Sequence, residues 1–409
     1  MEKTLPPHKT SRSYGLDWLR VVTTYLIIPI HVAIVFSPLP FYHIRNGTVS
    51  RGMLIFLALV EPWIMPLFFV LAGWAIYPSL RSRGSRQFLR ERVQKLFIPL
   101  LAGSLLLGPP IKYLELRSGF DETPLSQCSR EDPTHRFGPC LPVPTITQPF
   151  DESFFEFWPT FFTRFERFSW SHLWFLGYLF TFSVLYLPLF AWLARASWNI
   201  LHARAAWLYF PMLPLFLIEL TLRPYWPGMQ NLYRDWANWA YYSICLTAGF
   251  LLARSPALAQ SLNGEWKRAL WIGLAGLAIR VPTATGFLIS PTLSSVGQVV
   301  AGWGTILALI GFAQSRRARA NAALGYLGES AFPVYILHQV AVVGIGYAVI
   351  QLPFGIPVKY VLLLVAASAA TLAVYHFVVR PIPILRFAFG MKVVSGTVSR
   401  EQKAVSSEQ

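Results

Sequence analysis

The segment LDWLRVVTTYLIIPIHVAIVFS, residues 16–37, decides the class of fold. It is apolar over most of its length, and a helix needs roughly 20 such residues to cross the hydrocarbon core of a bilayer. Lys3, Lys9 and Arg12 precede the segment, but no small-residue cleavage site follows it. We therefore interpret it as a retained membrane span rather than a cleaved signal peptide.

Further apolar runs of the same length follow along the chain. Of the 409 residues, 54% are hydrophobic and only 13% are charged, whereas soluble domains carry roughly 25% charged residues. We predict an all-α, polytopic membrane bundle of about ten transmembrane helices. The expected spans are residues 16–37, 53–78, 93–117, 172–195, 204–222, 234–253, 267–290, 292–314, 323–348 and 357–381.

The net charge of +16 is distributed at the ends of these runs rather than over one folded surface, which argues against a nucleic-acid partner. Cytoplasmic loops are enriched in Lys and Arg, and most of the basic residues fall on one side if the N-terminus is cytoplasmic. This topology predicts that both termini are cytoplasmic. The expected parts are a cytoplasmic N-terminal segment 1–15, a transmembrane domain 16–381 and a disordered cytoplasmic tail 382–409.

A long polar segment, residues 118–171, separates two of the runs and lies outside the cell in this topology. It contains Cys128 and Cys140, two of the three cysteines. An exported pair can form a disulfide, which we expect here; the alternative is two unpaired thiols. We expect no metal site.

His31 is the strongest candidate for chemistry in the first span. It lies eleven residues after Arg20, so the two side chains are about 20° apart on one helix face and roughly 16 Å apart along the axis. Asp17 is one turn before Arg20 and can pair with it. An ionisable group inside a span is a candidate functional residue, although a neighbouring helix could simply satisfy the imidazole.

Other ionisable residues also fall inside predicted spans, and they are Glu61, Glu219, Arg280, Glu329, His338 and His376. A separate basic segment, Arg81 to Lys95, lies on the cytoplasmic side and includes Arg90 and Arg92. This segment can be the topology signal itself, a contact for anionic lipid, or a site for a phosphorylated ligand, because Arg side chains match phosphate oxygens.

Four motifs in order resemble the acyltransferase 3 family of membrane acyltransferases, over about residues 14–380. The first is Asp17, Arg20 and His31 in LDWLRVVTTYLIIPIHV, and the second is MPLFFVLAGW followed by QFLRERVQKLFIP. The third is SHLWFLGYLF with Trp174, and the fourth is GESAFPVYILHQ with Ser330, Tyr335 and His338. The MPLFF run is most similar to the branch that modifies periplasmic glucans.

Two positions depart from the family pattern. Ala72 replaces the usual Ser before Gly73, and Lys95 occupies a place where the family often has a second Arg after Arg92. Lysine carries the charge without a bidentate fork, which puts phosphate contacts at that position in doubt.

The resemblance implies an O-acyltransferase of the bacterial inner membrane that moves an acyl group from cytoplasmic acyl-CoA to an extracytoplasmic carbohydrate hydroxyl. Acyl-CoA is then a donor substrate, no cofactor is bound, and the partners are membrane lipid, acyl-CoA and the carbohydrate. His31 acts as general base, the role a group with a pKa near neutrality suits, or it takes the acyl group itself. Asp17 and Arg20 complete the expected catalytic group. The expected substrate-binding residues are Arg90, Arg92, Lys95, Trp174, Ser330, Tyr335, His338, Glu61 and Arg280.

A transporter or flippase without chemistry is the alternative function, because many spans and scattered intramembrane charges are also typical of that class. The sequence leaves open the acyl group, the acceptor and the oligomeric state.

Overall fold

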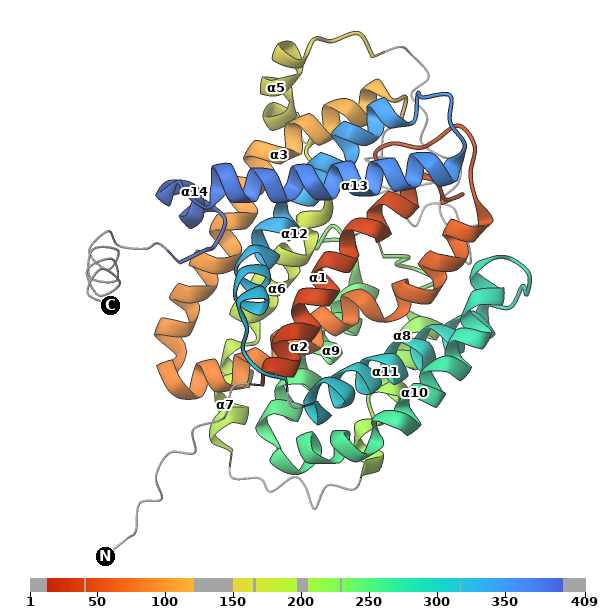
Figure 1. Ribbon diagram of the computed structural model, residues 1–409. Coiled ribbons are helices and arrows are strands. Elements are labelled where there is room, and N and C mark those ends of the chain that lie inside the picture. Colours follow the sequence, from red (N-terminus) through yellow and green to blue (C-terminus); the bar gives the residue numbers. More distant parts are fainter. Residues whose placement is uncertain are drawn as a thin grey trace, which may run out of the picture.

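The computed structural model describes residues 13–39, 42–120, 150–164, 167–196, 205–228, 230–316 and 318–392. Within these ranges the regular structure is entirely helical (Figure 1). Five helices are long and apolar enough to cross a membrane, or up to seven if each of two bent pairs counts as one span. The predicted all-α, multi-pass membrane architecture is therefore confirmed at this level.

The α-helices follow one another along the chain with short π-helical and 3-10 turns between some of them. Their bounds are α1 Tyr14–Val35, α2 Arg51–Arg92, α3 Ile98–Arg117, α5 Phe154–Thr163, α6 Trp174–Leu185, α7 Leu187–Arg195, α8 Met212–Thr221, α9 Trp236–Arg254, α10 Pro256–Ala284, α11 Pro291–Ser315, α12 Ala322–Val349, α13 Ile356–Val374 and α14 Pro383–Ala388. The short elements are η1 Val93–Phe97, η4 Ser171–Leu173, η5 Ala205–Leu208 and η6 Tyr375–Val379.

The expected number of ten spans stays a prediction, because several apolar runs do not form straight helices of spanning length. Helix α8 has only 10 residues. The pairs α6–α7 and α9–α10 bend by 56° and 104°. At the second bend Ser255 accepts a hydrogen bond from the backbone N–H of Leu258, and Pro256 begins α10. Proline suits the first turn of a helix because it lacks an N–H, so the sequence starts a new helix here.

The helix from Arg51 onwards contains two expected spans and turns sharply at Gly84. Gly84 has a φ of 72°, a left-handed conformation that glycine adopts without a steric penalty. In Figure 1 the orange ribbon reverses in this region, so that α2 and α3 run as separate arms.

Small residues bring α2 and α9 into close contact. A Cβ atom on Gly73 would lie 1.9 Å from the carbonyl oxygen of Leu246, and one on Gly249 would lie 2.0 Å from that of Val70. Only glycine fits at these positions, as is common where membrane helices pack through their backbones. This contact holds α2 against α9.

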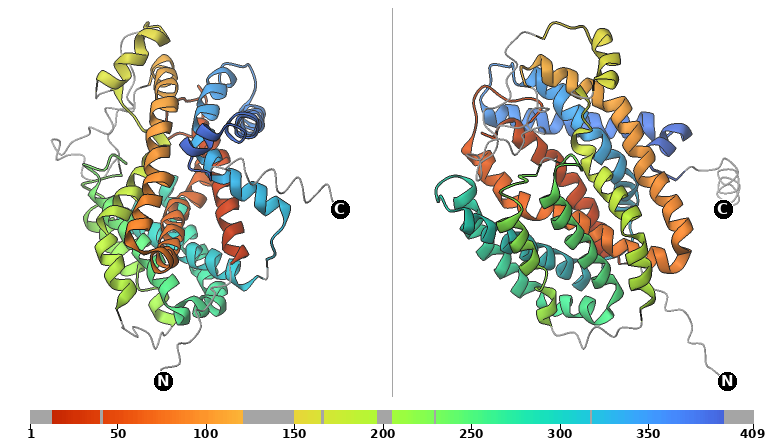
Figure 2. Two further views of the ribbon diagram at one scale, coloured as in Figure 1. Left: turned by 90° about the vertical axis from the view of Figure 1, so that its left-hand side faces the viewer. Right: turned by 180° about the vertical axis from the view of Figure 1, so that it is seen from behind.

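The long polar segment before η4 contains a helix of its own, α5, which packs on the end of α3 through Phe157, Phe161 and Leu116. Figures 1 and 2 show α5 and this end of α3 at one end of the molecule, with α7 towards the other. Cys128 and Cys140 lie outside the described residues. Helix α14 extends the helical part beyond the expected boundary at residue 381.

Candidate active site

Three histidines from separate parts of the chain form a line of contacts inside the bundle. His31 belongs to α1, His338 to α12, and His172 to the turn before α6. The ring centroids of His31 and His338 are 4.8 Å apart, and those of His338 and His172 are 4.9 Å apart. His338 is fully buried and His172 is 8% exposed. We call these residues the histidine line.

The hydrogen bonds of the histidine line determine which nitrogen of each ring carries a proton. A backbone carbonyl only accepts, so Nδ1 of His338 donates to the oxygen of Tyr335 at 2.7 Å. In a neutral ring this leaves Nε2 of His338 as an acceptor, and it lies 3.3 Å from Nδ1 of His31. Nδ1 of His31 also donates to the oxygen of Ile27 at 2.9 Å.

His31 therefore has its lone pair on Nε2 when the ring is neutral. Within the described residues Nε2 of His31 makes no hydrogen bond. A held ring with one unbonded basic nitrogen can take a proton from a hydroxyl group or attack an acyl carbon. On the same reasoning His172 donates from Nε2 to the oxygen of Ile336 at 3.0 Å, and its buried Nδ1 has no partner among the described residues.

A second polar network, the His43 network, lies beside the histidine line. Nδ1 of His43 is 2.5 Å from Oε2 of Glu115, and Nε2 of His43 is 2.7 Å from Oγ of Ser171. Lys112 forms an ion pair with Glu115. Tyr42 connects the two groups, with its ring centroid 5.3 Å from that of His43 and 6.0 Å from that of His31.

Neither His172 nor the His43 network was predicted from the sequence. Glu115 and Lys112 fall near the end of the predicted span 93–117, where charged residues are usually interfacial, and His43 follows the first span in a short loop. One feature of the sequence could have indicated part of this network. Lys112 and Glu115 are three residues apart on a helix, a spacing at which opposite charges pair.

The expected pair of Asp17 and Arg20 is present at the start of α1, with 3.6 Å between Nη1 of Arg20 and Oδ1 of Asp17. Nη2 of Arg20 also donates to the carbonyl of Leu71 in α2 at 3.3 Å. This pair therefore joins α1 to α2 about 16 Å along the helix from His31. Its expected catalytic role stays a prediction.

Ser330 and Tyr335 of the motif GESAFPVYILHQ make hydrogen bonds near the histidine line. The hydroxyl of Tyr335 donates to the backbone oxygen of His172 at 2.6 Å. Ser330 lies 2.8 Å from the hydroxyl of Tyr25 in α1. Trp174 is 6% exposed and packs among aromatic rings, including that of Tyr242 at 5.6 Å. The contacts of Tyr335 and Ser330 connect α12 to its neighbours, and Trp174 lies in the aromatic core.

Glu61 and Arg280 form a separate group. Nη2 of Arg280 is 3.1 Å from Oε2 of Glu61, and Gln298 bonds to both residues. Their interactions connect α2, α10 and α11, and their expected place in the substrate site stays a prediction. Glu219 pairs instead with Arg223 at 2.7 Å.

The basic segment of α2 and η1 places its residues differently. Arg90 is exposed and has no ion pair among the described residues. Arg92 stacks on the ring of Phe88 at 4.6 Å, and Lys95 pairs with Glu91 at 3.3 Å. Among the expected phosphate ligands, Arg90 therefore has exposed donors, and the buried Nε of Arg92 has no hydrogen-bond partner among the described residues.

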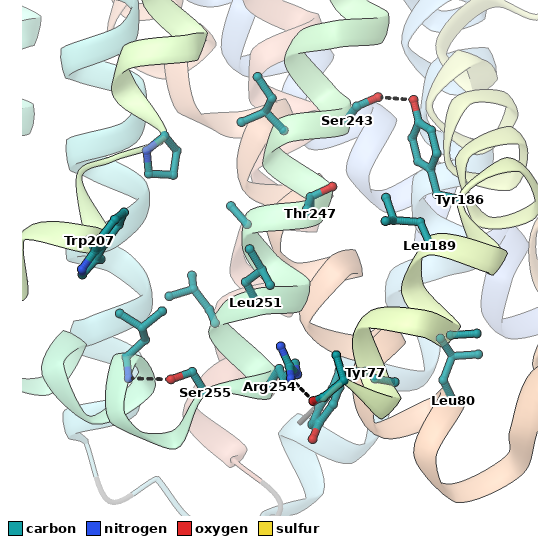
Figure 3. A pocket seen from close by; sticks show the side chains of 18 of the residues that line it. Tyr77, Leu80, Tyr186, Leu189, Trp207, Ser243, Thr247, Leu251, Arg254 and Ser255 are labelled. Atoms are coloured by element: carbon teal, nitrogen blue, oxygen red, sulfur yellow. Dashed lines mark hydrogen bonds between the residues drawn. The ribbon is translucent and has the colours of Figure 1, made fainter. Parts of the chain in front are cut away.

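A cavity of about 1440 Å³ lies between α2, α7, α8, α9 and α10. Figure 3 shows Thr247 and Leu251 along α9, with Tyr186 and Leu189 facing them from one side and Trp207 from the other. Its lining is mostly apolar, and its cations are Arg81, Arg195 and Arg254. The volume exceeds the roughly 300–1,000 Å³ of pockets for drug-sized ligands. An apolar cavity with several guanidinium groups suits a long anionic molecule.

No group of three or more His, Cys, Asp or Glu side chains among the described residues is arranged to hold a metal ion.

Comparison with known proteins agrees with the motifs. The model of the acyltransferase 3 family, described as an acyltransferase domain, matches residues 13–376. The chain is 23% identical over 189 residues to glucans biosynthesis protein C of Salmonella paratyphi B and of Salmonella heidelberg. Each match covers 45% of this chain and 40% of the relative, so the chain spans less than half the length of these curated relatives. No solved structure matches the chain.

Proposed function

The chain belongs to the acyltransferase 3 family, and we propose that it moves an acyl group from cytoplasmic acyl-CoA to a carbohydrate hydroxyl on the other side of a bacterial inner membrane. The name of the similar proteins, glucans biosynthesis protein C, favours a glucan as the carbohydrate. The apolar helices described above are consistent with a site enclosed by the bilayer.

The proposal depends most on His31 as general base. Its Nδ1–H is held by the carbonyl of Ile27 and by His338, which leaves Nε2 unbonded among the described residues and able to take the proton of the acceptor hydroxyl. The hydroxyl oxygen then attacks the carbonyl carbon of the acyl group, the new ester bond forms, and CoA is released as the thiolate over the whole reaction.

The donor is proposed to bind at the opposite end of the bundle. Arg90 is available for the phosphates of CoA, and the apolar cavity with Arg81 and Arg254 has room for a long arm. Phosphate contacts from guanidinium groups are charge-assisted and bidentate. In the expected topology both places face the cytoplasm, where acyl-CoA is found.

A transporter or flippase without chemistry would move a glycan or small molecule and form no ester bond. The family assignment favours acyl transfer over this alternative. The two functions differ in their product, which makes them separable in one assay.

The test uses inverted membrane vesicles that contain the protein and are loaded with glucan oligosaccharides. Labelled acetyl-CoA or succinyl-CoA is added outside, and mass spectrometry measures esters on the oligosaccharide. We expect esters with the wild type and a loss of roughly 10²–10⁴-fold in rate with His31→Gln. The matched control is His376→Gln, which removes an exposed imidazole near Tyr326. Export of unmodified oligosaccharide, or His31→Gln with near wild-type turnover, would contradict the proposal.

A further inference from the structure

We propose that Ser171, His43 and Glu115 form a second catalytic centre, in which Oγ of Ser171 carries the acyl group as an ester before the carbohydrate receives it. This inference rests on the proposed acyl transfer and assigns a covalent intermediate to it. It is carried by the geometry of the His43 network.

The three side chains have the order nucleophile, base and orienting carboxylate. Nδ1 of His43 lies 2.5 Å from Oε2 of Glu115, and a carboxylate accepts the proton on that nitrogen. Nε2 of the neutral ring then accepts from the hydroxyl of Ser171 at 2.7 Å. This is the arrangement by which a histidine activates a serine for nucleophilic attack.

The charges of the network favour a role beyond ion pairing. Lys112 and Glu115 already neutralise one another within α3, with side chains 2% and 1% exposed. His43, which is 3% exposed, bonds to Glu115 through Nδ1 and to Ser171 through Nε2. Burying a further imidazole has a desolvation cost. The hydrogen bond between Nε2 of His43 and Ser171 offsets part of that cost.

The backbone at Ser171 is also unusual. Its φ is 47°, a left-handed conformation that is uncommon for a residue with a Cβ atom and is strained. Such strain is frequent at functional sites, where the surrounding structure holds it in place. The following residue, His172, is held from both sides because its ring donates to Ile336 and its carbonyl accepts from Tyr335.

The position of Ser171 places the proposed ester beside the histidine line. Ser171 is bonded to His43, whose ring is followed by those of Tyr42 and His31. On its other side the chain continues directly into His172, which contacts His338. An acyl group on Ser171 is thereby presented towards the hydroxyl that His31 activates.

The acyl group is transferred first to Ser171 and then to the carbohydrate. Oγ of Ser171 attacks the thioester carbonyl and gives its proton to Nε2 of His43; the C–S bond breaks, and CoA leaves as the thiolate. In the second step the carbohydrate hydroxyl gives its proton to His31 and attacks the acyl-serine. The bond to Oγ breaks, and His43 returns its proton to Ser171. The net change is one thioester converted into one carbohydrate ester, with one proton released.

The test supplies labelled acyl-CoA to the purified protein without carbohydrate and maps acyl adducts by peptide mass spectrometry. We expect an adduct on Ser171 in the wild type and in His31→Gln, because the second step alone needs His31. Ser171→Ala should lose both the adduct and about 10²-fold or more of the transfer rate. Ser171→Cys should keep an adduct, now a thioester that neutral hydroxylamine removes.

The matched control is Ser118→Ala, since within the described part of the chain the hydroxyl of Ser118 bonds only to backbone oxygens of His43 and Glu115. If Ser171→Ala transfers acyl groups as fast as Ser118→Ala, or if the adduct lies on His31, the serine intermediate is wrong while acyl transfer stands. If the wild type esterifies no carbohydrate in the vesicle assay, the proposed function itself fails.

Discussion

Nε2 of His338 lies 3.3 Å from Nδ1 of His31, although the two residues are 307 positions apart in the chain. The contact joins α12 to α1 at the depth of the proposed base. His338 accepts from Nδ1 of His31, the nitrogen opposite the one proposed to react, and this contact favours a positioning role for His338. The substrate contact expected from the motif stays a prediction.

Substituting His338 should separate positioning from substrate binding. In His338→Gln the amide oxygen can occupy roughly the place of Nε2 and still accept from His31, so we expect less than a tenfold loss of kcat. His338→Leu cannot accept and should lower kcat by about 10²-fold, because small displacements of a catalytic group have effects of that size. Steady-state kinetics measure both, with the donor KM expected to stay unchanged.

Protein abundance in the membrane is the control for these variants, because His338 is fully buried. Equal activity of the Gln and Leu variants at equal abundance would show that the hydrogen bond does not orient His31. A rise in donor KM without a change in kcat would return His338 to the substrate site.

The sequence was informative about apolar length and about the motif residues on α1 and α12, but it did not reveal contacts between distant segments. His31, Tyr335 and His338 were all identified as site residues, and they lie together. The pairing of His43 with Glu115 and Ser171 spans 72 and 128 positions, and no local pattern indicates such a contact. The number of spans could also not be predicted from the sequence, because hydropathy does not show where the helices begin or bend, as they do at Pro256 and Gly84.

The predicted topology can be tested with introduced cysteines in a chain whose three native cysteines are replaced by alanine. Asp151→Cys, just before α5, should react with a membrane-impermeant maleimide in intact cells. Arg86→Cys, in the basic segment of α2, should react only after permeabilisation. Both residues are exposed, so accessibility depends on the side of the membrane. The opposite labelling pattern would invert the assignment of donor and acceptor sides.

The segment that contains α5 should become less stable in acid. Both nitrogens Nη1 and Nη2 of Arg167 bond to Glu152 at 2.6 Å, and these bonds hold the pKa of the Glu152 carboxyl below its usual value of 4.5. A lowered folded-state pKa stabilises the structure fully above pH 4.5, and the stabilisation is lost as the pH falls through the lowered value. The pair is partly exposed, so the effect should be only about 0–1 kcal/mol.

Hydrogen exchange of the α5 amides, corrected for intrinsic rates, measures this effect between pH 7 and pH 3. Glu152→Gln should show at pH 7 part of the faster exchange that the wild type shows in acid, because acid also protonates Glu156 of the capping box with Ser153. Asp151→Asn is the matched control, because Asp151 has no ion pair among the described residues. Protection that is independent of Glu152 would mean that Phe157 and Phe161 alone hold α5 on α3.

The donor site can be located by neutralising two pairs of arginines separately. If the phosphates of CoA bind along the exposed segment, Arg90→Gln with Arg92→Gln should raise the donor KM; if they bind in the cavity, Arg81→Gln with Arg254→Gln should do so. Each charge-assisted hydrogen bond contributes about 1.5–3 kcal/mol, so an effective pair should raise KM by at least about tenfold. The acceptor KM should not change, because these residues lie apart from the histidine line. Lys267→Gln removes a charge from the same predicted side, near Trp266, and should leave both KM values as they are. An equal rise in donor and acceptor KM, or the same effect in Lys267→Gln, would instead assign the arginines to topology or anionic lipid.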